Sequence, residues 1–406
     1  MRIPDFQLEG NKCTCCGCEA CVQKCPHSAI SMIRDDEGFY YPIIDNEKCV
    51  DCRLCSQICQ YQHTVSKCQE TQVAYGGHII DEKVLNESTS GGAFSAIVDE
   101  WCDYNYVIFG AMANGIKVKH SFISDKSQLA AFRRSKYSQS VIGDSYKEAL
   151  SFLKLGKKVL FSGTPCQIAA LKSFLKDRYY ENLLTVEVVC EGVPSPLFIE
   201  KLEKKLGGKI TTLDYRYKDN DRWDFQVMYI ENNNSHKPLK RDRWFNPFWS
   251  IWLNHLMSRP SCYNCLYATN ARVADITLGD LWGVHLYCPD LYNDNKGASL
   301  IVANTEHGRL LVESIMGKTF EGRELDFSTA LKYQGPMRKS IPMNPGRNAF
   351  MKDLLSMDYD SICKKWSKRP SLKLIISKYL CGTNRQVVRK WKMKQKFTKL
   401  KQDKQC

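Results

Sequence analysis

The strongest constraint on this chain is a pair of cysteine runs near its N-terminus. The first run is C-C-G-C-E-A-C-V-Q-K-C-P, and the second is C-V-D-C-R-L-C-S-Q-I-C. Both follow the pattern C-x-x-C-x-x-C-x-x-x-C, in which three thiolates bind one [4Fe-4S] cluster and the fourth reaches a second cluster. The first segment is therefore expected to fold around two clusters and to carry electrons.

This crossed pattern, typical of bacterial ferredoxins, assigns four ligands to each cluster. One cluster is expected on Cys15, Cys18, Cys21 and Cys59, and the other on Cys49, Cys52, Cys55 and Cys25. Zinc is the alternative, but two separated C-x-x-C pairs would explain neither the displaced fourth cysteine nor the duplication. Cys13 and Cys16 lie outside the pattern and are expected to bind no metal. Gln60 replaces the proline that often follows the last cysteine.

Composition places the chain among large proteins with reduced thiols. Its 406 residues are 43% hydrophobic and have room for two or three domains. Twenty cysteines in a chain of this length favour metal sites over the disulfide framework of a small secreted domain. The N-terminal sequence has no apolar signal segment and no run of 18 apolar residues occurs, so we expect a cytoplasmic protein without a transmembrane segment.

The formal net charge of +14 is concentrated at the C-terminus. Residues 364–406 hold 15 of the 58 Lys and Arg residues and one acid, Asp403. With Trp366, Trp391 and Phe397 among these cations, the segment could make peripheral contact with an anionic membrane or an acidic partner, or could simply be solvated. Nucleic acid is an unlikely partner, because the rest of the chain has no net charge.

Three regions are expected along the chain. Residues 1–67 are expected to form an α+β ferredoxin-like domain. Alternating strands and helices then predict an α/β domain with a parallel sheet over residues 68–340, and residues 341–406 are expected to form a helical, basic segment. The strands of the sheet are expected at 106–113, 117–124, 158–163, 183–190, 274–280 and 298–305.

Four further cysteines are expected to meet at one edge of that sheet. Cys166 begins a helix after Thr164, where the helix dipole favours a thiolate, and Cys190 ends the next parallel strand. Cys262 and Cys265 form a C-x-x-C pair. The four thiolates could hold a third [4Fe-4S] cluster, with zinc as the alternative. Cys166 alone could also be a redox or nucleophilic cysteine, or a residue that fills space.

Two other segments suit an anionic cofactor. The stretch S-T-S-G-G precedes an amphipathic helix, whose first amides could bind a phosphate. The stretch R-R-S-K-Y supplies cations beside an aromatic ring, which could hold a pyrophosphate or lie on the surface. No G-x-G-x-x-G, Walker A or H-E-x-x-H motif occurs, and no catalytic residue is assigned.

Taken together, the motifs resemble the coenzyme F-420 hydrogenase/dehydrogenase beta-subunit family, with a fused two-cluster ferredoxin. The resemblance rests on S-T-S-G-G-A-F, S-K-Y-S-Q-S, F-S-G-T-P-C-Q-I-A-A-L, C-E-G-V-P-S-P, R-P-S-C-Y-N-C, D-I-T-L-G-D-L-W-G and K-G-A-S-L. It implies an α/β flavin-binding domain that holds FAD beside a [4Fe-4S] cluster on Cys166, Cys190, Cys262 and Cys265. The flavin contacts that it implies are Ser88, Thr89, Ser90, Gly91, Gly92, Ser135, Lys136 and Tyr137.

The resemblance also implies electron transfer between iron-sulfur partners and organic acceptors, among them a deazaflavin coenzyme and chlorophyll-type rings. We therefore expect an iron-sulfur flavin-dependent oxidoreductase, in which electrons from a redox partner protein cross the clusters, collect on FAD and reach an unknown organic substrate. The alternative is an electron-transfer subunit that docks on a separate catalytic partner. A nucleic-acid-binding iron-sulfur protein is a third and weaker interpretation.

Overall fold

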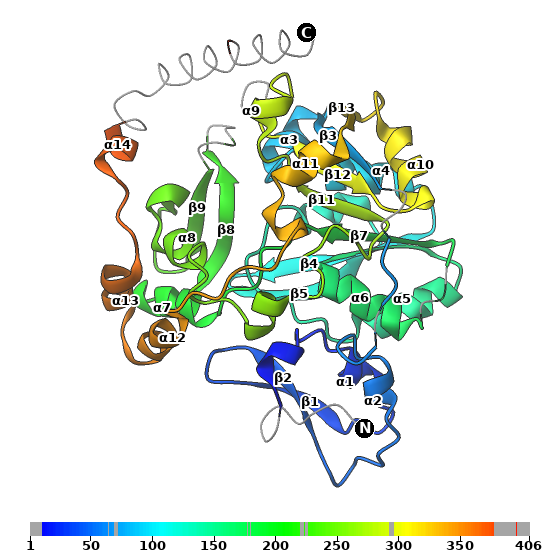
Figure 1. Cartoon of the computed structure of the whole chain (residues 1–406), viewed down its shortest axis with the longest axis horizontal. Helices are drawn as coiled ribbons and strands as arrows, with labels where there is room; N and C mark the ends of the chain where they lie inside the picture. The colour runs from blue at the N-terminus through cyan, green and yellow to red at the C-terminus, as the bar shows by residue number, and fades with distance from the viewer. Residues whose placement is uncertain are drawn as a thin grey trace.

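A computed structural model of the chain describes residues 10–376, except 64, 69–71, 177, 179, 220–222, 224–225 and 292–295, together with residue 395. The described part contains a large mixed sheet with helices on both faces, a small antiparallel sheet beside it, and a cysteine-rich N-terminal unit, residues 10–63, at one edge (Figure 1). Most of the basic C-terminal segment, including Trp391, Phe397 and Asp403, lies outside the described residues.

The large sheet has the strand order β13-β3-β12-β11-β7-β6-β4-β5. Its four central strands are parallel to one another, whereas β5, β12, β3 and β13 run antiparallel to their neighbours. The strands are β3 (Val73–Ile79), β4 (Tyr106–Asn114), β5 (Lys117–Ile123), β6 (Lys158–Gly163), β7 (Leu183–Val188), β11 (Ile276–Asp280), β12 (Ser299–Ala303) and β13 (Phe320–Leu325).

Alternating side chains of the central strands pack into two separate hydrophobic cores, as expected for a sheet that is covered on both faces. Ile108 and Leu160 pack with α4 (Ala93–Trp101) and α10 (Glu306–Ile315) on one face. Phe109 and Phe161 pack with α5 (Ser145–Lys154) and α6 (Pro165–Phe174) on the other. Shorter helices border the sheet: α3 (Glu82–Glu87), η2 (Lys126–Ala131), α9 (Val284–Tyr287), α11 (Phe327–Lys332) and η8 (Gly335–Met337).

The six strands expected from the sequence are all present, but the expected parallel arrangement holds for only part of the sheet. The last strand of the parallel set, β4, turns back through the two-residue loop Gly115-Ile116, and Gly115 has a φ of +58°. A glycine with positive φ at the first position of a two-residue loop is typical of a hairpin, so β5 pairs antiparallel with β4. The sheet is therefore mixed, and the parallel arrangement holds only for β4, β6, β7 and β11.

A second, antiparallel sheet lies beside the large one (Figure 1). It has the order β10-β9-β8, and a buried aromatic cluster joins it to helices from the C-terminal part of the chain. Its elements and their neighbours are α7 (Leu197–Lys205), β8 (Ile210–Lys218), β9 (Gln226–Asn232), β10 (Leu239–Asp242), η5 (Arg243–Phe245), α8 (Pro247–Trp252), η6 (Pro260–Asn264), α12 (Arg347–Ser356), α13 (Tyr359–Trp366) and α14 (Leu372–Ile375). In the described part, no helix is long and apolar enough to cross a bilayer.

The N-terminal unit packs directly on the α5 and α6 face of the large sheet. It contains η1 (Lys12–Thr14), α1 (Ala20–Lys24), the hairpin of β1 (Ile30–Arg34) and β2 (Tyr40–Ile44), and α2 (Leu54–Gln57). Ala20 and Ile58 of the unit, and Val65 just beyond it, are buried in the same cluster as the side chains of α5 and α6. The unit therefore shares a hydrophobic core with the sheet.

The Gln23 side chain of α1 caps the N-terminus of α5, and Glu19, just before α1, binds the loop that leads into α5. The Gln23 Oε1 atom accepts hydrogen bonds from the amides of Tyr146 and Lys147, at 3.0 and 3.2 Å. The Glu19 carboxylate accepts from the amides of Ile142 and Gly143, each at 3.0 Å. Because the first amides of a helix have no partner within it, the N-terminal unit supplies a cap that α5 lacks on its own.

We expect Gln23→Ala to destabilise the docked structure by about 2 kcal/mol, because the buried amide of Tyr146 and the partly buried amide of Lys147 lose their acceptor. The thermal unfolding midpoint should fall by a few degrees. Gln128→Ala, which truncates an exposed glutamine of η2, is the matched control and should leave the midpoint unchanged. An unchanged midpoint for Gln23→Ala would show that the cap contributes nothing to docking.

Candidate functional site

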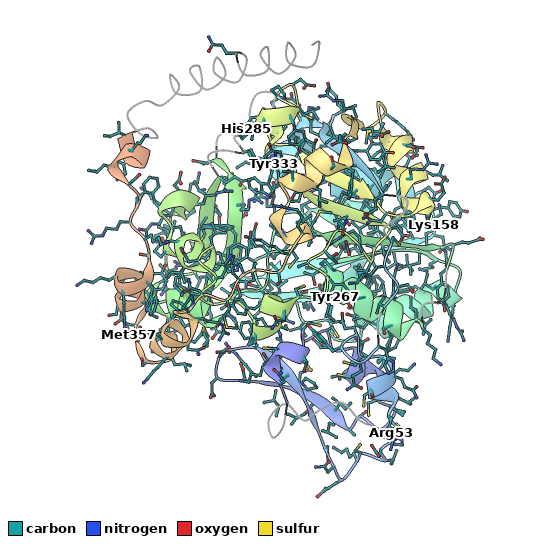
Figure 2. All side chains as sticks on the ribbon, viewed as in Figure 1. Arg53, Lys158, Tyr267, His285, Tyr333 and Met357 are labelled. Carbon is teal, nitrogen blue, oxygen red and sulfur yellow. The ribbon has the colours of Figure 1, made fainter. Side chains whose placement is uncertain are left out.

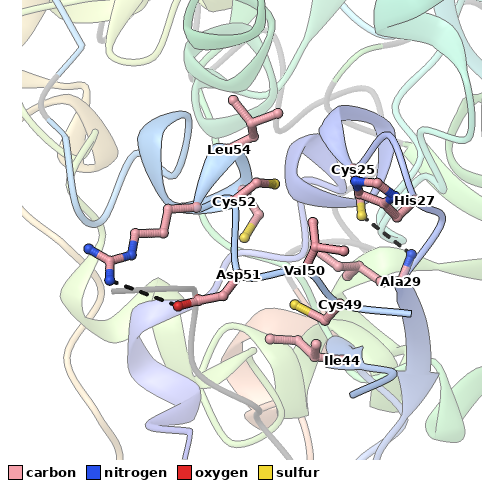
Figure 3. A pocket seen from close by; sticks show the side chains of 12 residues that line it. Cys25, His27, Ala29, Ile44, Cys49, Val50, Asp51, Cys52 and Leu54 are labelled. Atoms are coloured by element: carbon pink, nitrogen blue, oxygen red, sulfur yellow. Dashed lines mark hydrogen bonds and ion pairs between the residues drawn. The ribbon is translucent and has the colours of Figure 1, made fainter. Parts of the chain in front are cut away.

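Cys25, Cys49, Cys52 and Cys55, the second thiol set, line one cavity of about 20 Å³ in the N-terminal unit. Figure 3 shows Cys25, Cys49 and Cys52 around it, with Val50 and Ile44 beside them. The amide of Ala29 donates to the Cys25 Sγ atom at 3.3 Å. Cys25 thus joins the three cysteines of the other run, as the crossed pattern requires.

Cys15, Cys18, Cys21 and Cys59, the first thiol set, gather on the side nearer to the sheet. Burial raises the pKa of Cys21 well above its usual range, and the nearby thiols of Cys18, Cys15 and Cys59 raise it further. Cys18 also packs against the core that contains α5 and α6. The first set therefore lies where the N-terminal unit meets the sheet.

The two cysteine runs share an unusual backbone conformation. Gly17 and Glu19 in the first run have φ values of +67° and +62°, and Asp51 and Arg53 at the equivalent places in the second have +50° and +61°. Residues other than glycine adopt such angles at a cost of about 1–3 kcal/mol. In the first run, the Gly17 amide donates to the Cys15 Sγ atom at 3.4 Å, and inward amides of this kind form the anion-binding nests of many iron-sulfur sites.

Cys166, Cys190, Cys262 and Cys265, the third thiol set, line a cavity of about 50 Å³ at the edge of the large sheet. Burial raises the pKa of Cys190 well above its usual range, and Cys262 and Cys166 raise it further. Cys190 lies two residues beyond the end of β7, and Cys166 lies in the first turn of α6. The strand ends thus bring together four cysteines that are up to 99 residues apart in the sequence.

The local sequence explains how two of these thiols are positioned. Thr164 and Gln167 form a reciprocal capping box at the start of α6, and the Thr164 hydroxyl lies 3.2 Å from the Cys166 Sγ atom. Gly192 has a φ of +96°, and a Cβ atom there would lie 3.2 Å from Cys262 Cβ. Among the described residues, no three His, Cys, Asp or Glu side chains are close enough together to surround a single metal ion.

Cys16 and Gln60 are residues of this site that the spacing rules missed. Cys16 lines the third cavity, and its contacts with the thiols of Cys166 and Cys18 raise its pKa well above the usual range. The Gln60 amide group donates to the Cys16 Sγ atom at 3.2 Å and to the Cys166 carbonyl at 2.9 Å. The residue that replaces the usual proline therefore connects the first and third thiol sets.

A buried histidine supports the turn that carries Cys166. His120 of β5 contacts the Ser162 carbonyl through Nε2 at 2.9 Å and the Ser140 hydroxyl through Nδ1 at 2.8 Å. Ser140 in turn accepts a hydrogen bond from Gln167. Since a carbonyl can only accept, Nε2 carries a proton. Burial lowers the pKa of His120 to about 4, so the ring is neutral at pH 7.

The two segments expected to contact a flavin meet each other. The Ser135 amide donates to the Thr89 hydroxyl at 3.0 Å. However, the Gly91 amide already donates to Ser299 Oγ at 2.9 Å, and Lys136 turns back onto the carbonyls of Ala131 and Arg133. The Ser95 amide also donates to the Gly92 carbonyl, at 3.1 Å, so the first-turn amides of α4 that remain as donors for a phosphate are those of Ala93 and Phe94.

The geometry around Gly91 and Tyr137 also limits their roles. A Cβ atom at Gly91 would lie 2.4 Å from the Ser299 amide nitrogen and 2.5 Å from the Gly77 carbonyl oxygen, so the strands themselves require this glycine. The Tyr137 ring packs edge-on against Trp249 and Trp252, with centroids 4.8 and 4.9 Å apart. Its ring is therefore part of the aromatic core beneath β8 and β9.

Asp280 is a further residue at this edge that the sequence did not single out. It ends β11 and forms a buried bidentate ion pair with Arg216 of β8, at 2.5 and 3.0 Å. Trp223 donates to the same carboxylate at 3.1 Å. The pair thus joins the two sheets beside Ser90. The sequence did not indicate this ion pair, because Arg216 and Asp280 are 64 residues apart.

We expect stability to depend on His120 below neutral pH. The ring titrates at 6.5 when unfolded and near 4 when folded, so the unfolded state takes up the proton first. The stability from keeping this ring neutral is present above pH 6.5 and is lost as the pH falls toward 4, by about 3 kcal/mol. His120→Asn should remove this part of the pH dependence of unfolding, whereas His236→Asn, at an exposed site, should not. An unchanged slope in His120→Asn would contradict the assignment.

Comparisons with known proteins bear on the large sheet. Residues 156–325 match the family model that describes the C terminus of the beta subunit of coenzyme F420 hydrogenase/dehydrogenase. Among solved structures, the chain is similar to a chain of a xenon-derivatised F420-reducing [NiFe] hydrogenase complex from Methanosarcina barkeri, at 16% identity and a TM-score of 0.42, over 74% of this chain and 91% of that chain. No curated protein matches. The family match confirms the resemblance seen in the motifs, and the matched residues 156–325 include the third thiol set.

Proposed function

We propose that this protein is an iron-sulfur flavoprotein oxidoreductase that passes electrons to an organic substrate. The observation that carries the proposal is the succession of three thiol sets from the N-terminal unit to the sheet edge. In Figure 2, Arg53, beside the second set, lies at the outer end of the unit, and Tyr267, which lines the third cavity, lies toward the sheet. The first set lies at the junction between them. Clusters bound in these sets would carry single electrons to a flavin, which exchanges one or two.

The donor chemistry of the third cavity favours a [4Fe-4S] cluster over zinc. A zinc ion needs four ligands drawn in to about 2.3 Å from one centre, whereas each thiolate of a cubane binds a different iron. The four cysteines are spaced around a cavity of about 50 Å³, larger than the ~10–15 Å³ that one water needs. That spacing suits a cluster better than one ion.

FAD is proposed to bind where the first turn of α4 and the loop at residues 135–137 approach the strand ends. β11 runs parallel to β7, so Asp280 lies at the same edge as Cys190. Gln334 donates to the Asp280 carbonyl at 2.8 Å, and nearby Pro336 lines the third cavity. A flavin held at this edge would therefore lie beside the third thiol set.

A redox partner protein is proposed to approach at the second thiol set. Cys52 is exposed, and Val50 keeps 60% of its surface exposed beside the cavity. Electron transfer falls steeply with distance, so a donor would use the most accessible set. The reduced thiols that this function requires favour a cytoplasmic location.

Iron analysis of anaerobically purified protein tests the three sites. We expect about twelve irons per chain for three [4Fe-4S] clusters. Cys190→Ser and Cys52→Ser should each lose about four irons, because each removes a ligand from a different set. Cys13→Ser, which lies outside all three sets, is the matched control and should retain all of them. Full iron content in Cys190→Ser, or zinc in the third site, would contradict the proposal.

The flavin is tested by the release of FAD on denaturation. Burial lowers the pKa of Lys136 to about 8, which leaves the side chain mostly cationic at pH 7 beside the proposed phosphate site. We expect Lys136→Met to lower FAD occupancy several-fold through the loss of this charge, whereas Lys119→Met, at an exposed lysine of β5, should have no effect. Full occupancy in Lys136→Met would place the flavin elsewhere.

A further inference from the structure

Arg259 is a buried cation between the first thiol set and the third cavity. Its side chain is 1% exposed. Nε donates to the Cys15 carbonyl at 3.0 Å, and the NH2 nitrogen donates to the Tyr40 carbonyl at 2.8 Å. The same nitrogen lies 3.8 Å from the Cys15 Sγ atom. Arg259 also lines the third cavity, three residues before Cys262. It therefore faces both thiol sets.

No carboxylate balances this charge within the described part of the chain. The other buried arginines there each have one, since Arg216 pairs with Asp280, Arg272 with Glu187 and Arg347 with Glu37. Apart from the Cys15 Sγ atom, the partners of Arg259 are two carbonyls, the Gln139 amide oxygen at 3.0 Å and the Tyr41 ring, whose centroid is 4.3 Å from the guanidinium carbon. All of these are neutral.

An unbalanced guanidinium at this depth would cost several kcal/mol. The surrounding residues nevertheless make room for it. Gly17, between Cys15 and Cys18, has no Cβ, and a Cβ atom there would lie 2.9 Å from the Arg259 NH1 nitrogen. The guanidinium also stacks on Tyr41, and its donors are matched to fixed carbonyls. A buried pocket that accommodates a cation without a carboxylate partner implies that negative charge is present nearby in the functional protein.

Thiolate-bound iron-sulfur clusters are that negative charge. We propose that Arg259 tunes the clusters of the first and third thiol sets, by raising their reduction potentials relative to that of the second set. This inference rests on the proposed function. Reduction adds one negative charge to a cluster, and a fixed cation in a buried, low-dielectric site favours that addition. Arg259 does not line the cavity of the second thiol set, so its charge would affect a cluster there least. Electrons from the outer set would then move inward down a gradient that Arg259 helps to set.

The test is an EPR-monitored redox titration of the full-length, anaerobically purified protein. Arg259→Gln removes the charge, and Arg259→Lys keeps it while losing the fork of donors. We expect Arg259→Gln to make reduction at the first and third sets at least tenfold less favourable, which is about 59 mV for one electron. Arg259→Lys should show less than half of that shift, and the second set should not move in either variant. Cys52→Ser and Cys190→Ser identify which signal belongs to which set.

Arg347→Gln is the control for the loss of a buried arginine, because Arg347 pairs with Glu37 and lines neither cavity. It should leave all three potentials unchanged. Equal shifts in Arg259→Gln and Arg259→Lys, or no shift in Arg259→Gln with its clusters intact, would show that Arg259 only holds the two parts together. If Arg259→Gln loses its clusters, Arg259→Lys is the deciding variant. A wild-type difference between the reduction potentials of the first and third sets and that of the second set supports tuning by charge. Loss of that difference overturns the proposal. Wild-type protein without clusters would instead disprove the proposed function itself.

Discussion

The buried junction between the N-terminal unit and the edge of the large sheet is the contact on which the rest of the structure depends. It is held by a shared apolar core and by polar groups that neither side could satisfy alone. Gln23 caps α5, Glu19 binds the loop before that helix, and Gln139 donates to the carbonyls of Cys16 and Gly17 at 2.9 and 3.1 Å. Because each of these bonds is directional, the junction fixes orientation as well as distance. The first and third thiol sets are neighbours only while it is intact.

Backbone strain recurs in the two cysteine runs. Glu19, Asp51 and Arg53 adopt left-handed conformations that cost free energy, and Glu19 and Arg53 occupy equivalent positions of the duplicated runs. Strain of this kind persists where the surroundings determine the conformation fully. In the first run, the Gly17 amide donates to the Cys15 Sγ atom at 3.4 Å, a contact that would favour an anionic cluster.

Along the same edge, the segments expected to bind a cofactor already form hydrogen bonds and close contacts with the rest of the protein. Ser90 donates to the Ala298 carbonyl at 2.7 Å, and Gly91 is required by the close approach of two strands. Glycines and hydroxyls before a helix therefore serve packing here as well as any ligand. The buried pair of Arg216 and Asp280, which joins the two sheets beside this segment, is the larger electrostatic feature.

The sequence by itself determined the local features. Cysteine spacing assigned Cys25 to the opposite run, hydrophobic runs located β6 and the helix that follows it, and the order of motifs identified the family. These succeed because ligand spacing and strand periodicity act over a few residues. Only the tertiary structure brought Gln60 and Cys16 to Cys166 and Arg259 to Cys15. These pairs are separated by 106, 150 and 244 residues along the chain. It also decided that the sheet is mixed. Such contacts depend on how layers pack, and packing leaves no periodic trace in the chain.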